Sequence, residues 1–177
     1  AITCCEDFAP KGINYRMSPE NAGCLTAAAI DCCVLANNHV LDWERAGFFD
    51  TLTTLQRLRI AHAGAGRDLD QARAPAALHI AGKGRVLVFS FAVVTSGTPR
   101  SWAATQHAPG VSLLNDLSEE TAARVCDHIV RHRQPHDVII VSIHWGPNWG
   151  YDIPEEQRNF AHALIERADV SVVHGHS

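Results

Sequence analysis

The sequence predicts one α/β domain, and three observations lead to this prediction. Short apolar runs rich in β-branched residues recur along the chain, amphipathic helical segments lie between them, and one Gly-Lys-Gly turn marks a hairpin. The predicted order is strand, helix, strand, hairpin, helix, strand, helix, strand. This order is typical of a sheet with parallel βαβ units. The length of 177 residues fits a single domain.

The N-terminal part of the chain predicts a loop, a strand and a helix. Proline and glycine punctuate residues 1–30, which are expected to form a loop that leads into a short helical piece at 25–30. A buried strand is expected over 31–36. Asp42 is a candidate N-cap of the helix that follows. The apolar face of this helix has helical spacing and comprises Phe48, Phe49, Leu52, Leu55 and Leu58.

The middle of the chain predicts three strands and a long loop. A short strand is expected near 60–63, and two further strands at 77–81 and 85–91. Glycines on both sides of Lys83 predict a hairpin between the last two, because glycine supplies the positive φ of such turns. Residues 95–117 predict a loop, and a loop of this length is more often functional than not.

The C-terminal part predicts two helices that alternate with two strands. Ser118 is the expected cap of the first helix, and two acids follow in its first turn. A β-branched strand is expected over 137–143, and a helix begins at Pro154. A last strand is expected over 170–173. The predicted buried faces of the two helices are Ala122, Val125, Cys126, Ile129 and Val130, then Phe160, Ala161, Leu164 and Ile165.

Composition limits the classes of function. A hydrophobic content of 46% and a charged content of 19% are typical of a globular chain. The net charge of -4 argues against non-specific nucleic-acid binding, which needs a basic face. No apolar run approaches the roughly 20 residues that cross a bilayer. The six cysteines lack zinc-type spacing and are predicted to be reduced, with a disulfide from the Cys4-Cys5 pair as the alternative.

Three predicted strands end in polar groups. Asn37-Asn38-His39 follows the first strand, His144 follows the strand at 137–143, and His174-Gly175-His176 follows the last. Ligands of open α/β sheets bind at the carboxyl ends of strands. Imidazole nitrogens and amide oxygens are suitable donors for Zn, Mn or Fe. One such histidine alone is more often structural, but three equivalent strand ends favour a shared metal site.

The motifs also carry a family resemblance. The segments concerned read "LANNHVLDWERAGFFDTLTTLQRLRIAHAGAG", "VSIHWGPNWGY" and "QRNFAHALIERADVSVVHGHS". Together they resemble the CapA family of bacterial capsule, or poly-γ-glutamate, synthesis proteins, which belongs to the calcineurin-like metallophosphoesterase superfamily. The resemblance covers nearly the whole chain. It implies a β-sandwich flanked by helices, of which 1–177 would be one domain, incomplete at both ends.

The resemblance also implies a site with two divalent transition metal ions, Mn, Fe or Zn. Asn38, His144 and His176 match metal-ligand positions of the family, and His39 matches a residue that acts on the leaving group. Asp42 is expected to cap a helix or to orient His39. Positions near the site or near substrate are expected for Trp145, Asn148 and His174. The acidic motifs of the superfamily have no clear counterpart, and Glu6 and Asp7 are the candidate substitutes.

Two functions follow as expectations from this resemblance. In the first, the intact protein hydrolyses a phosphoester with a metal-activated water, and the present chain alone is inactive. In the second, it is an accessory module that binds poly-γ-glutamate in a capsule synthesis or export complex. A basic groove would favour the second, but Arg67, Arg73, Arg100 and Arg124 are scattered along the chain and do not predict one. The compartment stays open between cytoplasm and a membrane-associated or cell-surface location.

Overall fold

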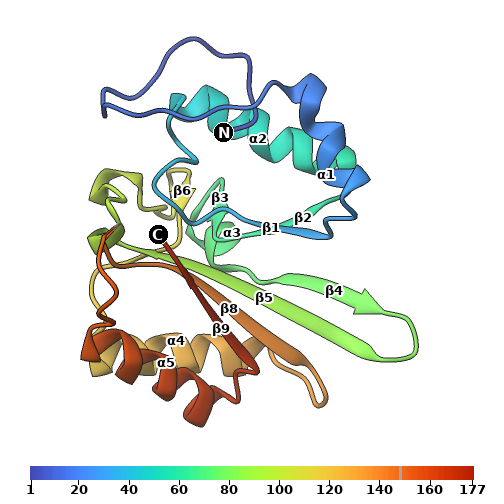
Figure 1. Ribbon diagram of the computed structural model, residues 1–177. Coiled ribbons are helices and arrows are strands. Elements are labelled where there is room, and N and C mark those ends of the chain that lie inside the picture. The colour runs from blue at the N-terminus through green and yellow to red at the C-terminus, as the bar shows by residue number, and fades with distance from the viewer. Residues whose placement is uncertain (148) are drawn as a thin grey trace.

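The structure, a computed structural model that describes residues 1–147 and 149–177, has four layers: helix, sheet, sheet and helix (Figure 1). Helix α2 (Glu44–Leu58) lies on one outer side. Helices α4 (Glu119–His132) and α5 (Glu155–Ala168) lie on the other. Between them, a layer of two small sheets packs on a five-stranded sheet. This arrangement confirms the predicted α/β class and is a sandwich of sheets flanked by helices.

The five-stranded sheet is mostly parallel. Strand β5 (Gly84–Val93) pairs in parallel with β8 (Val138–His144), and β8 pairs in parallel with β9 (Val172–His176). On the other side of β5, β4 (Ala76–Ile80) pairs antiparallel with β5 through the predicted hairpin. Strand β7 (Leu113–Leu114) pairs in parallel with the C-terminal end of β5. The predicted βαβ units are therefore confirmed, because α4 and α5 are the crossovers between parallel strands.

The main core lies between this sheet and the two helices. Ser118 caps α4 as predicted, since its hydroxyl accepts a hydrogen bond from the backbone N–H of Thr121. Two of the predicted core positions are wrong: Val130 is 51% exposed and Ile165 is 47% exposed. Each follows a fully buried residue by one position, so it lies about 100° further round the helix, outside the narrow buried face. The largest fully buried side chains here are Leu87, Phe89, Ile129, Ile139, Ile143, Phe160 and Leu164.

The second layer contains short strands. Strand β1 (Cys32–Val34) pairs in parallel with β2 (Ala61–Ala63), and β3 (Ala65–Gly66) pairs antiparallel with β6 (Gly110–Val111). Helix α2 covers this layer with Phe48, Leu52 and Leu55. The two sheets meet through small side chains such as Ala63, Ala76 and Val88. Small residues let the sheets approach closely, which brings the end of β1 near the ends of β8 and β9.

The structure differs from the sequence predictions in the irregular segments. Helix α1 covers Gly23–Ala27, after a 3₁₀ turn at Pro19–Ala22, and ends earlier than predicted. Helix α3 (Leu69–Arg73) was not predicted, because five residues are too few to show a helical period. Asp68 caps it by accepting from the N–H of Gln71. The long loop contains β6, β7 and two 3₁₀ turns at Val94–Ser96 and Arg100–Trp102.

Two predictions from composition can be compared with the structure. All six cysteines are free thiols, as predicted. Among the helices of the described residues, none combines the length and the apolar character that crossing a membrane requires.

Candidate metal and substrate site

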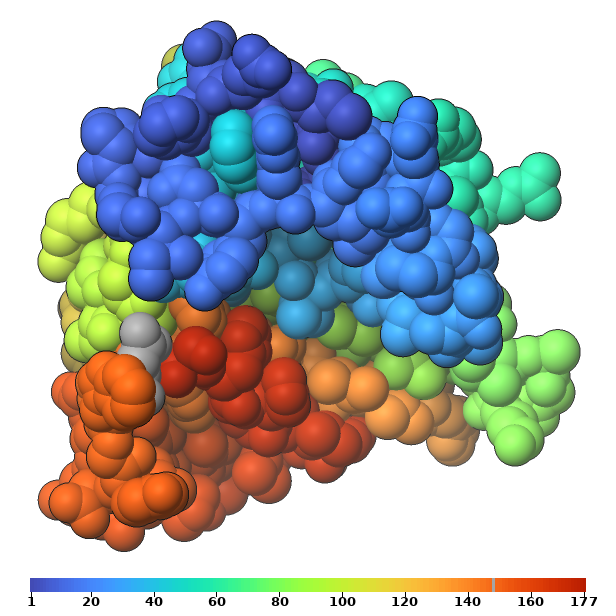
Figure 2. Space-filling view, turned by 45° about the horizontal axis from the view of Figure 1, so that its top comes forward, coloured from blue at the N-terminus to red at the C-terminus, as the bar shows by residue number. Residues whose placement is uncertain are grey.

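The strand ends converge on one pocket of about 500 Å³. His144 is the last residue of β8 and is paired with His176, the last residue of β9. Asn38 and His39 reach the same pocket from the turn after β1, in the other sheet. Figure 2 shows the N-terminal segment (blue) and the C-terminal strand (red) on either side of a hollow. Among the described residues, those that line it are Tyr15, Asn37, Asn38, His39, His144, His176 and Ser177.

The two strand-end histidines form a closely packed pair. Their Nδ1 atoms are 3.2 Å apart and their ring centroids 4.8 Å apart. Burial, followed by the neighbouring His176 and His39, lowers the pKa of His144 to about 4. Burial, with His174 beside it, also lowers the pKa of His176. Both rings are therefore neutral at neutral pH, which is the form that binds metal ions.

Three buried polar atoms in the pocket, each of a type that can bind a metal ion, have no hydrogen-bond partner among the described residues. They are Oδ1 of Asn38 and the Nε2 atoms of His144 and His176. Buried polar atoms are nearly always satisfied in folded proteins, so these three call for an explanation. In the His144–His176 pair one Nδ1 donates to the other, which leaves at least one Nε2 with a free lone pair. The Nδ2 group of Asn38 donates to the carbonyl of Ser96 at 3.1 Å and so fixes its orientation.

These donors fit a transition metal ion. Neutral imidazole nitrogen and amide oxygen are suitable ligands for Zn, Mn or Fe. Oδ1 of Asn38 and the unprotonated Nε2 offer lone pairs directly, and the other Nε2 offers one when the hydrogen bond between the two Nδ1 atoms breaks and its proton leaves. The set is incomplete, because none of the described residues that line the pocket has a carboxylate side chain. The candidate substitutes Glu6 and Asp7 are exposed and are absent from its lining. No group of three or more His, Cys, Asp or Glu side chains in 1–147 and 149–177 is placed to hold a metal ion.

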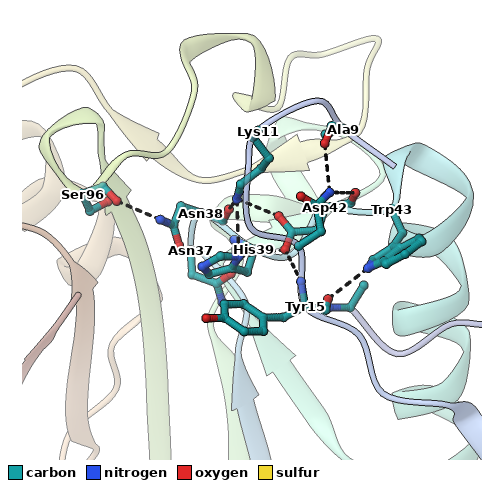
Figure 3. Close-up of polar contacts among 11 residues, drawn as sticks. Ala9, Lys11, Tyr15, Asn37, Asn38, His39, Asp42, Trp43 and Ser96 are labelled. Carbon is teal, nitrogen blue, oxygen red and sulfur yellow. Dashed lines mark hydrogen bonds and ion pairs between the residues drawn. The ribbon is translucent and has the colours of Figure 1, made fainter. Parts of the chain in front are cut away.

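His39 is held by a buried carboxylate. Nδ1 of His39 lies 2.7 Å from Oδ2 of Asp42, whose side chain is completely buried. Because a carboxylate only accepts, Nδ1 carries a proton and its N–H donates a hydrogen bond to Asp42. Asp42 also accepts from the ammonium group of Lys11 and from the N–H of Tyr15, each at 2.7 Å (Figure 3).

The two roles predicted for Asp42 require different contacts. Helix α2 begins after Trp43 and has no side-chain cap, so the prediction of Asp42 as an N-cap is wrong. Its carboxylate instead contacts the imidazole of His39, which is the orienting role. Asp42 does not line the pocket.

The structure adds two residues that the sequence did not indicate, Lys11 and Tyr15, and a contact of the strand-end residue Asn37. Lys11 donates to the backbone carbonyl of Asn38 as well as to Asp42 (Figure 3). The ring of Tyr15 meets the ring of His39 edge-on, with centroids 4.6 Å apart. Asn37 accepts from the N–H of His39 through Oδ1 at 2.9 Å. Lys11 and Tyr15 lie in an irregular segment without periodicity, so no pattern in the sequence indicated them.

Comparison with known protein families identifies the family of the chain that carries this site. The profile of the family described as bacterial capsule synthesis protein PGA_cap matches residues 1–177. The chain belongs to the PGA_cap family. The resemblance to capsule synthesis proteins seen in the sequence is thereby confirmed.

Curated relatives of this PGA_cap chain come from several bacteria. A Mycobacterium tuberculosis (strain H37Rv) protein named "Probable polyglutamine synthesis accessory protein" is 43% identical over 99% of this chain and 47% of its own length. The Bacillus subtilis (strain 168) "PGA biosynthesis protein CapA" is 24% identical over 95% of this chain and 42% of its own length. The Bacillus anthracis "Capsule biosynthesis protein CapA" is 24% identical over 95% of this chain and 39% of its own length. The chain thus spans about half the length of these relatives, or less.

The remaining predicted site residues of the PGA_cap chain lie beside the pocket or outside the described residues. His174 stacks on His176 with ring centroids 5.4 Å apart, and its Nδ1 is 3.1 Å from the hydroxyl of Ser142. The ring of Trp145 packs edge-on against the ring of Phe160, with centroids 6.3 Å apart. Neither His174 nor Trp145 lines the pocket. Asn148 lies outside the described residues.

Proposed function

We propose that this PGA_cap chain binds a transition metal ion at the strand-end pocket and that the whole protein uses this site to hydrolyse a phosphoester. The observation that carries the proposal is the set of three buried, unpartnered donor atoms on Asn38, His144 and His176. Mn, Fe and Zn suit this set better than calcium, because imidazole is a poor ligand for calcium.

The described residues supply enough candidate ligand atoms for one metal ion, whereas the family resemblance implies two. A second ion would need further donors, carboxylates above all, which do not line this pocket. When bound, such ions polarise a phosphoryl oxygen and lower the pKa of water.

The residues around His39 are suited to move a proton. Asp42 holds the Nδ1 proton, so the imidazolium form of His39 would give its Nε2 proton to the leaving oxygen as a general acid and become neutral. Lys11 balances the charge of the buried Asp42 carboxylate. Tyr15 packs against the His39 ring and limits its rotation.

A second candidate function is suggested by the name of the M. tuberculosis relative, "Probable polyglutamine synthesis accessory protein". In this case the chain would bind poly-γ-glutamate within a capsule synthesis complex without hydrolysing it. Such binding does not require the donor atoms of the strand-end pocket. The two functions therefore respond differently to the loss of those atoms.

The test uses the full-length protein and its His144→Ala variant, with His107→Ala as the control, because His107 is exposed and away from the pocket. Metal content is measured after dialysis, and turnover of bis(p-nitrophenyl) phosphate is measured with added Mn²⁺. We expect His144→Ala to lose bound metal and turnover together, while His107→Ala keeps both. Metal without turnover of any phosphoester would favour the accessory function. Unchanged metal content in His144→Ala would overturn the metal site.

A further inference from the structure

A second pocket of about 240 Å³ lies on the opposite face of the five-stranded sheet. Phe91 of β5 contributes to it and belongs to the core beneath α4. Phe91 is paired with Ile143, which points to the same helix-covered side, whereas the next residue, His144, points to the strand-end pocket. Neighbouring residues of a strand face opposite sides of the sheet, so the two pockets are separated by the sheet itself.

Three arginines surround this second pocket, which we call the arginine pocket. Arg124 and Arg131 come from α4, and Arg73 comes from the end of α3. Asp127 is the one acidic residue among the described residues of the lining, so the formal charge of the lining is +2 on a chain of net charge -4. The sequence did not predict a basic groove from Arg67, Arg73, Arg100 and Arg124. Two of these four, Arg73 and Arg124, line this pocket together although they are far apart in the sequence.

The helical repeat explains the row on α4. Arg124, His128 and Arg131 are spaced by four and three residues, so their side chains project from the same face of the helix. The seven residues from Arg124 to Arg131 correspond to about 10.5 Å along the axis. His128 fixes the third arginine relative to this row, because its Nε2–H donates to the backbone carbonyl of Arg73 at 2.9 Å. The three charges are thus held around one opening.

Two of the three guanidinium groups are available to a ligand. Among the described residues, neither Arg73 nor Arg131 forms a side-chain ion pair. Arg124 pairs with Glu120 at 2.6 Å, but both side chains are largely exposed, and such pairs contribute little. The floor is apolar, from buried residues such as Leu114 and Val125. An anion that enters therefore meets arginine side chains at the rim and little competing negative charge.

We infer that the arginine pocket binds the carboxylates of an acidic polypeptide. The planar guanidinium matches a carboxylate with two parallel hydrogen bonds. A row of about 10.5 Å suits several carboxylates along one chain better than a single small anion. The inference does not depend on hydrolysis or on metal at the strand-end pocket, which lies across the sheet.

The test uses the full-length protein and fluorescein-labelled poly-γ-glutamate, with binding followed by anisotropy at physiological ionic strength. The variant is Arg73→Gln/Arg131→Gln. The control is Arg57→Gln/Lys83→Gln, which removes the same charge from exposed positions elsewhere. We expect the first to weaken binding by roughly tenfold or more, because charge-assisted hydrogen bonds are lost, and the control to bind like wild type.

Further measurements separate the alternatives. Arg73→Lys/Arg131→Lys keeps the charge but not the paired hydrogen bonds and should bind with intermediate affinity. His144→Ala should bind the polymer normally, so that failure of the metal site would leave this result unaffected. Equal weakening in the variant and its control, or no weakening in either, would overturn the inference. Tighter binding of single-stranded DNA than of poly-γ-glutamate, or displacement of the polymer by millimolar phosphate, would also overturn it.

Discussion

Nδ1 of His39 donates a hydrogen bond of 2.7 Å to a carboxylate of Asp42 that is completely buried. A buried carboxylate is costly unless its charge is compensated, and here Lys11 supplies the compensating charge at 2.7 Å. The irregular segment that carries Lys11 and Tyr15 is thus fastened to the turn after β1. The site depends on this segment even though Lys11 does not line the pocket.

The first prediction concerns the stability of this ion pair. Lys11→Met should lower the free energy of unfolding by about 2–4 kcal/mol, because it leaves Asp42 buried without its cation. Lys83→Met is the control, since Lys83 is exposed in the hairpin, and it should change stability by less than about 0.5 kcal/mol. Urea unfolding of both variants and wild type measures the difference. Equal stability of the two variants would show that Asp42 is compensated without Lys11.

The second prediction separates the roles of two histidines in the proposed hydrolase. His39→Ala should lower kcat by about 10²–10⁴-fold while metal content stays at the wild-type level, because His39 is assigned to proton transfer. His144→Ala should lose the metal itself. Metal analysis and steady-state kinetics on the same preparations distinguish the two effects. Loss of metal in His39→Ala would move His39 from the general acid to the ligand set.

The regular elements could be predicted from the sequence because they depend on local patterns. The Ser118 cap, the hairpin glycines and the β-branched strands each contain their signal within a few residues. The convergence of Asn38, His144 and His176 also followed, because parallel strands bring their carboxyl ends to one edge.

The missed features depend on contacts between distant segments. Lys11 reaches Asp42 across 31 residues, and Arg73 meets α4 through a hydrogen bond that spans 55 residues. Neither segment has a periodic pattern that indicates its partner. The sequence left the role of Asp42 open between two options for the same reason: a position just before a helix favours a cap, whereas in the structure the carboxylate binds Lys11 and His39.

The third prediction concerns the close approach of the two sheets. A Cβ at Gly64 would lie 2.6 Å from Oγ of Ser90 and 2.7 Å from Cβ of Ala36, at a φ of +88°. Gly64→Ala should therefore destabilise the fold by about 2–5 kcal/mol, through overpacking and a left-handed backbone. Gly82→Ala is the matched control, because Gly82 has a φ of +73° but nothing within 4 Å of the added atom.

The difference in unfolding free energy between these two glycine variants isolates the cost of the steric clash at Gly64. Gly82→Ala should cost only about 1–2 kcal/mol, the backbone contribution. Chemical unfolding of both variants measures it. Similar losses in both would mean that Ser90 and Ala36 move aside and that the sheets are less tightly packed than the structure shows.

The last prediction concerns acid stability at the start of α4. Asp116 accepts hydrogen bonds from the hydroxyls of Ser118 and Thr121, each at 2.6 Å. These bonds, with that of Ser118 first, lower the pKa of Asp116 to about 2. The folded state therefore favours the ionised form. Its stabilising effect is complete above the ordinary pKa of 3.8 and is lost as the pH falls to about 2.

Asp116→Asn should consequently be less stable than wild type at pH 5, and the difference should shrink as the pH is lowered from 5 towards 2. Unfolding free energies at several pH values in this range measure the trend. Asp152→Asn serves as the control, because Asp152 is exposed and, within the described part of the chain, forms no ion pair. A difference between wild type and Asp116→Asn that stays constant with pH would mean that the hydroxyls bind the neutral acid as well as the carboxylate. The cap of α4 would then depend on Ser118 alone.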